Sequence, residues 1–277
     1  MEDKHDLEIR ITELEKFDFS NFNNARFKEY KTLFFSTFGK IATIPSMHIA
    51  AKENKFSRAR VSKDKRGFSR LSEMWYPPKH ISAAGRLNYP QDRLLYTAEN
   101  DTTSIIEVHP EKGDFISIIN FNIFGIDQFK CLDFGFIREE KKTILTEPST
   151  KSFHDFTCKK CREMVTKDEQ YKYSPTILAA KSIFRSPFDA YGYLSVAANF
   201  SAINIAFKPE FANKFLKFKD LRVVEVINKM ENQIYEVKCL RYSNQLTSDN
   251  QFIFDKIDNC KGHIIDSKNS FESQDHT

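Results

Sequence analysis

From Phe56 onward the chain is a succession of short apolar runs of strand length, and long helical patterns do not alternate with them regularly. A sheet of parallel strands needs such alternation, because the crossover between two parallel strands usually contains a helix. No repeat at a fixed period is visible either. The pattern therefore favours a mixed α+β domain over a doubly wound parallel sheet.

The individual elements follow from periodicity and from helix-start signals. We expect a helix after the cap sequence Asp101-Thr102-Thr103 that reaches Glu107, and two later helices at 152–167 and 175–184, the second opened by a proline. The expected strands are 56–61, 93–98, 115–121, 129–134, 190–195, 202–207, 221–228 and 234–240.

The first fifty residues have a different pattern. Phe27, Tyr30, Leu33 and Phe34 recur at helical spacing, and Asn23 or Asn24 is placed to cap that helix. We therefore expect a helical extension at 1–50, a main domain at 51–245, and a terminal segment at 246–277 whose last residues form a frayed tail.

Length and composition set the broad class. A chain of 277 residues with 27 phenylalanines can bury a core without disulfides. Its five cysteines form an odd set with no regular framework, which is typical of a reducing compartment. The charged amino terminus leads into no apolar run, and no stretch has the length of a membrane span. We expect a cytoplasmic protein with no membrane partner.

The charge of the chain is close to balanced, at +4, but residues 55–70 are strongly basic. Such a segment is either a solvated surface loop or a basic rim that attracts a phosphorylated substrate or an acidic partner. Aromatic residues are not set at regular intervals among these charges, so we do not expect direct binding of nucleic acid.

Three short motifs point to a ligand. Arg86, Tyr96 and Glu107 follow one another at intervals of about ten residues, each beside apolar or small neighbours, and Ser195 and Asn204 come much later. A guanidinium binds phosphate through two hydrogen bonds, an aromatic ring stacks on a base, and a carboxylate stabilises a cationic sugar. NAD contains all three partners and is the leading candidate.

These residues resemble the RES domain family, which is named for an arginine, a glutamate and a serine. The resemblance rests on Phe56–Arg60, the Pro77-Pro78 loop, Gly85–Asn88, Leu95–Ala98, Ile106-Glu107, Gly192–Val196 and Asn204–Ala206. It covers roughly residues 56–240 and leaves the first fifty residues and the tail outside.

The resemblance implies a fold similar to the ADP-ribosyltransferase toxins: a mixed or antiparallel sheet core with flanking helices. It also implies consumption of NAD, by a glycohydrolase or phosphorylase or by transfer of ADP-ribose to a protein acceptor. Family members look like toxins of bacterial toxin–antitoxin pairs, so an antitoxin protein is the expected partner. A non-catalytic nucleotide-binding module is the alternative from another class.

Each residue carried over has an expected role. The plain structural alternatives are a helix-surface glutamate for Glu107 and a surface salt bridge for Arg86. Glu107 is expected to stabilise the sugar cation, Arg86 to bind pyrophosphate, and Ser195 to donate a hydrogen bond to phosphate or ribose. Tyr96 either stacks on nicotinamide, or donates its hydroxyl to the ligand, or packs in the core as a strand aromatic. The expected ligand contacts of second rank are Arg58, Arg60, Asn88 and Asn204.

Two other chemistries compete with this interpretation. His154, Cys158 and Cys161 offer three metal ligands, but a lone Cys-x-x-Cys lacks the second pair of a structural zinc site, so no metal is expected. With only 8 glycines, the chain has no glycine-rich loop to cradle phosphates, which argues against kinases, P-loop enzymes and Rossmann domains. His80 and His109 are isolated and more typical of structural or exposed histidines.

Overall fold

Contacts within the computed structural model divide the chain into two compact units that interleave along the sequence. Unit 1 comprises Met1–Met47, Pro78–Arg93 and Lys130–Tyr193, and unit 2 comprises His48–Pro77, Leu94–Phe129 and Leu194–Thr277. Because the units interleave, the division expected at residues 50 and 245 stays a prediction. The structure describes residues 4–19, 23–39, 46–52, 54–136, 148–182, 187–230, 233–255 and 262–265.

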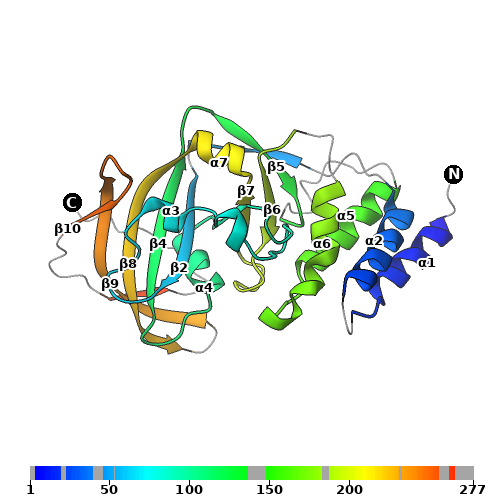
Figure 1. Ribbon diagram of the computed structural model, residues 1–277, viewed down its shortest axis with the longest axis horizontal. Helices are drawn as coiled ribbons and strands as arrows, with labels where there is room; N and C mark the ends of the chain where they lie inside the picture. The colour runs from blue at the N-terminus through cyan, green and yellow to red at the C-terminus, as the bar shows by residue number, and fades with distance from the viewer. Residues whose placement is uncertain are drawn as a thin grey trace. The chain divides into compact units, whose positions relative to one another are not determined.

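Unit 1 is built mainly from helices that pack on one another, and Figure 1 shows them side by side. Strands β5 (Gln128–Asp133) and β6 (Ala190–Leu194) form a parallel pair, with Cys131 opposite Ala190. The helices are α1 (Lys4–Glu15), α2 (Asn24–Phe38), α5 (Pro148–Cys161) and α6 (Ser174–Ser182), with 3₁₀ turns η1 (Lys79–Ile81) and η3 (Lys167–Tyr173).

Helix α2 confirms the expected start and spacing. The side chain of Asn23 accepts hydrogen bonds from two backbone N–H groups of the first turn, which otherwise have no partner in a helix. Tyr30, Phe34 and Phe38 are buried, and the Phe34 and Phe38 rings contact Phe153 of α5 edge to face. Aromatic packing therefore attaches α2 to α5.

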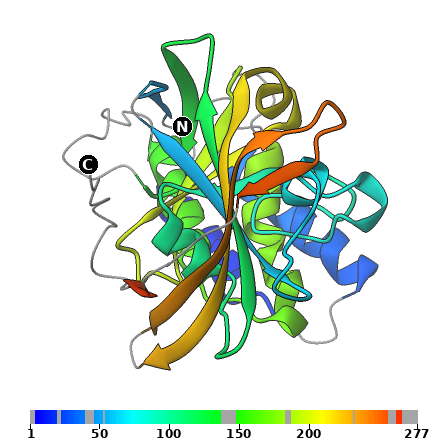
Figure 2. The same cartoon turned by 90° about the vertical axis from the view of Figure 1, so that its left-hand side faces the viewer.

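Unit 2 is an antiparallel sheet in the strand order β7-β3-β2-β4-β8-β9-β10, with β11 paired to β9. Figure 2 shows that β2, β4, β8 and β9 are strongly twisted relative to one another. The strands are β2 (Lys55–Ser62), β3 (Leu95–Ala98), β4 (Phe115–Ile123), β7 (Ile203–Phe207), β8 (Leu216–Met230), β9 (Ile234–Leu246), β10 (Phe252–Asp255) and β11 (Gly262–Ile265). Helices α3 (Leu71–Met74), α4 (Asp101–Glu107) and α7 (Pro209–Phe215) connect them, and β1 (Ser46–Ala50) spans the boundary between the units.

Helix α4 lies against one face of this sheet. Ile105 and Ile106 are fully buried in a cluster with Ala59 of β2, Ile118 of β4 and Val224 of β8. Full burial of one isoleucine side chain contributes roughly 1.5–3 kcal/mol, so these two residues alone fix which face of α4 meets the sheet. The register of α4 then determines where its last residue, Glu107, lies.

The structure confirms the mixed α+β class and the approximate position of each expected strand. The ADP-ribosyltransferase-like type stays a prediction. Several details differ: α4 is capped by Asn100, one residue before the expected cap, and the helix expected at 152–167 is α5, which begins at Pro148 and ends at Cys161. The elements α7, β10 and β11 were not expected, and β8 begins well before residue 221. The early part of β8, from Leu216 to Lys219, has the apolar and polar alternation of a half-buried strand, which the predicted strand at 221–228 left out. The expected tail at 266–277 lies outside the described residues, within which no helix is long and apolar enough to cross a bilayer.

Candidate functional site

Glu107 is the last residue of α4 and the only half-buried residue of that helix, since the six before it are buried. Its carboxylate oxygen Oε1 accepts a hydrogen bond from the hydroxyl of Ser195 and another from the side-chain amide of Asn204, both at 2.5 Å. The three residues are brought together from α4, the end of β6 and the start of β7. Sequence reasoning predicted all three, separated by up to 97 positions.

The surroundings of the carboxylate are arranged to hold it in place. Ser195 is fully buried and its Oγ also accepts from the backbone N–H of Ala198 at 2.9 Å, so the hydroxyl proton is directed toward Glu107. Asn204 is 3 % exposed and pairs with Ala98 across β7 and β3. A carboxylate at the carboxyl end of a helix is disfavoured by the helix dipole, and these two donors offset that cost.

Only one oxygen of Glu107 is used in this way. Among the residues that the structure describes, Oε2 has no hydrogen-bond donor, while Oε1 has two. A carboxylate has about four acceptor positions, so Oε2 is free to accept from a hydroxyl of a ligand or to face a positive charge. The cluster formed by Glu107, Ser195 and Asn204 is named the acidic triad below.

Polar contacts at the other end of α4 fix the helix on the sheet. Asp101 forms an ion pair with Arg222 of β8 and lies 3.5 Å from the ammonium of Lys55 of β2. Burial acts to raise the pKa of the Asp101 carboxyl, but the two cations outweigh it and leave that pKa below its usual range. The hydroxyl of Ser104 contacts that of Ser57 at 3.0 Å.

Tyr96 occupies a position compatible with the triad. It is half-buried in β3, and strand alternation places its side chain on the same face as Ala98, whose partner is Asn204. The structure gives no contact between the Tyr96 side chain and Glu107, and its role stays a prediction.

Arg58 and Arg60 have different surroundings. They alternate along β2 with Ser57 and Ala59, which face α4, so both arginines leave the strand on the opposite face. Arg58 donates to the backbone carbonyl of Tyr96 at 2.8 Å, and its buried Nε has no partner. Burial, aided by Arg60, lowers the pKa of Arg58 to about 10. Neither arginine contacts Glu107, so their predicted part in ligand binding receives no geometric support.

Arg86 and Asn88 belong to unit 1 and are described there. The Arg86 guanidinium donates to the carbonyls of Cys161 and Glu163 at 2.8 and 3.2 Å, and lies over the ring of Tyr173 at 5.3 Å. The amide of Asn88, 3 % exposed, donates to backbone carbonyls of its own turn. These contacts shape the local fold, and the predicted ligand roles of both residues remain predictions.

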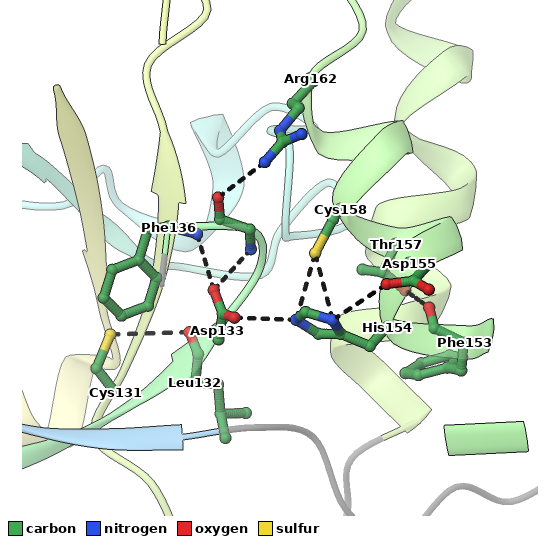
Figure 3. A network of polar contacts seen from close by, with 11 residues as sticks. Cys131, Leu132, Asp133, Phe136, Phe153, His154, Asp155, Thr157, Cys158 and Arg162 are labelled. Carbon is green, nitrogen blue, oxygen red and sulfur yellow. Dashed lines mark hydrogen bonds and ion pairs between the residues drawn. The ribbon is translucent and has the colours of Figure 1, made fainter. Parts of the chain in front are cut away.

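A second polar cluster lies in unit 1 and is drawn in Figure 3. The His154 Nε2 is 2.9 Å from Asp133 and 3.3 Å from the Cys158 sulfur, and all three side chains are buried. The other oxygen of Asp133 accepts from the backbone N–H groups of Gly135 and Phe136, both at 2.8 Å. Asp133 and the Cys158 thiol both contact Nε2 of His154. A cysteine nucleophile and its carboxylate instead contact different nitrogens of the histidine, so this cluster lacks that arrangement. The cluster links β5 to α5.

The metal alternative gains no support from this geometry. No group of three or more potential ligands within the described ranges is arranged to hold a metal ion, and this includes His154, Cys158 and Cys161. Burial raises the pKa of the Cys161 thiol to about 12, which disfavours the thiolate that a metal site needs.

Comparisons with known proteins add no family assignment. Neither the models of known protein families nor the curated proteins gave a match to this chain.

Sequence reasoning did not find the residues that support the triad. The Ala198 N–H, Asp101 and Arg222 act through contacts between distant segments, and no local pattern marks them. The one available signal for the Asp101–Arg222 pair was an aspartate at the start of an apolar helix and an arginine in a strand, and such a pattern is weak.

Proposed function

We propose that the chain cleaves NAD at the nicotinamide–ribose bond, with water or phosphate as the acceptor. The observation that carries this proposal is the acidic triad: a half-buried carboxylate with one oxygen held by two donors and the other free. The RES-like order of Arg86, Glu107 and Ser195 in the sequence supports it independently.

Cleavage of the nicotinamide–ribose bond is favoured by such a carboxylate. When the bond breaks, the nicotinamide leaves as a neutral base and the ribose becomes cationic, so no strong acid is needed. The free oxygen of Glu107 is suited to accept from a ribose hydroxyl and to face the developing charge. Ser195 and Asn204 fix the carboxylate before the substrate arrives, so little reorganisation accompanies the reaction.

The electrostatic stabilisation expected from Glu107 is large enough to raise the rate of bond cleavage substantially. A carboxylate ~4 Å from the cation interacts by about 4 kcal/mol at an effective dielectric near 20. If most of that energy is gained only in the transition state, the rate rises by roughly a thousandfold.

The test is release of free nicotinamide from NAD by the purified chain, with and without inorganic phosphate. Replacing Glu107 by glutamine keeps an acceptor for Ser195 and removes the charge, so release is expected to fall by about a hundredfold or more. A matched control is Glu111→Gln, because Glu111 is exposed and paired with Lys229 at the surface of the same unit.

The outcomes separate the alternatives. Equal release by the wild type and Glu107→Gln would exclude the catalytic role of Glu107. ADP-ribose found on a protein instead of in solution would favour the transferase, and NAD binding without turnover would favour a nucleotide-binding module.

The biological setting is part of the same proposal. An enzyme that depletes NAD arrests its own cell unless it is restrained, which is consistent with a toxin held by an antitoxin protein. Co-expression with the product of the adjacent gene should restore growth if this setting is correct, whereas growth that is unaffected by the chain alone would contradict it.

A further inference from the structure

The loop between β6 and β7 contains an aromatic residue in an unusual setting. Phe200 has a φ of 62° and follows Asn199, whose φ is 49°. Asparagine tolerates left-handed backbone, but the conformation is rare for a residue with a bulky side chain. The Phe200 side chain is nevertheless 40 % exposed.

Hydrogen bonds within the loop account for the backbone conformation of Phe200 but not for the exposure of its ring. The Phe200 N–H donates to the Ser195 carbonyl at 2.8 Å, and the Ser195 N–H donates to the Ala202 carbonyl at 2.8 Å. No ring–ring or cation contact in the described part of the chain involves Phe200. An exposed phenylalanine on regular backbone needs no explanation, but strained backbone that presents a partly exposed ring indicates a function.

The position of the Phe200 backbone in the hydrogen-bond network suggests the function. Phe200 is bonded through its N–H to Ser195, and the hydroxyl of Ser195 is bonded to Glu107. The backbone of Phe200 is thus two hydrogen bonds away from the carboxylate that faces the ribose in the proposed function. The nicotinamide ring is attached to the ribose carbon at which the positive charge develops.

We propose that the phenyl ring of Phe200 stacks on the nicotinamide ring of bound NAD, a role that rests on the proposed function. In NAD this ring is a pyridinium cation, and a cation is attracted to the face of an aromatic ring. The attraction is present in the bound substrate and fades as the ring leaves as a neutral base. Phe200 therefore strengthens substrate binding more than it accelerates bond cleavage.

The test measures binding without turnover. In a Glu107→Gln background, Phe200→Ala is expected to weaken NAD binding by about 5- to 30-fold, the range of a partly desolvated cation–aromatic contact. Binding of NADH, whose nicotinamide is neutral, is expected to weaken less, and binding of ADP-ribose, which has no nicotinamide, is expected to stay unchanged. In the active enzyme, Phe200→Ala should raise KM with kcat within about threefold of the wild type.

Two further variants keep the result interpretable. Phe124→Ala removes another exposed ring of unit 2, 72 % exposed, and is expected to change none of these affinities. Phe200→Gly removes the ring and also tolerates the left-handed backbone, so a loss shared by Phe200→Ala and Phe200→Gly comes from the ring and not from a distorted loop.

Each outcome decides the question. An equal loss for NAD, NADH and ADP-ribose, or no loss for any of them, would overturn the stacking role while normal nicotinamide release kept the proposed function. Absence of nicotinamide release and of NAD binding in the wild type would overturn both.

Discussion

At the scale of single residues, the molecule concentrates its unusual chemistry around Glu107. The carboxylate ends a helix where the dipole disfavours it, a buried serine and asparagine compensate, and a nearby phenylalanine adopts left-handed backbone. The helix-end carboxylate and the left-handed phenylalanine cost stability, and all three features occur along one hydrogen-bonded path. This concentration supports the proposal that the site was selected for chemistry.

Asn204 allows a direct test of this electrostatic arrangement. Asn204→Asp places a second carboxylate 2.5 Å from that of Glu107, so the two share a proton and one pKa is raised. We expect a loss of about 2–4 kcal/mol in the free energy of unfolding at pH 7. Because the raised group is protonated in acid in both folded and unfolded states, the loss should shrink as the pH falls toward 4.

Chemical denaturation between pH 4 and 8 measures this. Asn204→Ala is the control, since it removes the hydrogen bond without adding charge and should cost roughly 1 kcal/mol, with a much weaker pH dependence than Asn204→Asp. A pH-independent loss for Asn204→Asp would show that the two groups do not face each other.

At the scale of elements, the short helix α4 is held at both ends. Two isoleucines fix its face on the sheet, and the Asp101–Arg222 pair with Lys55 fixes its start. A seven-residue helix has little stability of its own, so tertiary contacts decide its position. Because Glu107 is the last residue of α4, these structural contacts also position the proposed catalytic group.

Asp101→Asn tests the anchor. Removing the charge leaves Arg222 with Asp220, 3.8 Å away, as its remaining carboxylate, and because the Arg222 side chain is 25 % exposed we expect a loss of about 2 kcal/mol, less than for a fully buried pair. The pKa of Asp101 is lower in the folded state, so its stabilisation is present above the usual value of 3.8 and is lost as the pH falls through the lower folded value.

The difference in unfolding free energy between the wild type and Asp101→Asn should therefore be largest near neutral pH and disappear once the pH falls below the lowered folded pKa of Asp101. If the difference in unfolding free energy persists unchanged in acid, it comes from poor packing of the asparagine, and the ion pair contributes nothing.

At the scale of the whole molecule, two units are formed from segments that alternate along the chain, so both need most of the sequence to be complete. Four cysteines of the described residues are not in disulfides: Cys131, Cys158 and Cys161 in unit 1 and Cys239 in unit 2. The first three are buried and Cys239 is half-buried. Their accessibility can report on the folding of each unit.

Alkylation of the native protein at pH 8 should modify Cys239 first. The three cysteines of unit 1 should react at least about a hundredfold more slowly, because burial hides the sulfurs and raises the pKa of Cys131 and Cys161. Mass spectrometry of peptides reads each cysteine separately. Rapid labelling of Cys158 in the native state would contradict the buried cluster with His154 and Asp133.

Sequence alone was enough for the mixed α+β class and for the cap and apolar face of α2, because these depend on local periodicity. The resemblance to the RES family pointed to Glu107, Ser195 and Asn204, which the structure brings into contact. The fold was needed to show which oxygen of Glu107 is occupied, that Asp101 and Arg222 hold α4, and that Arg58 and Arg60 leave β2 on the face opposite α4. Hydrogen bonds and strand register join residues far apart in the chain, so local patterns carry no record of that pairing.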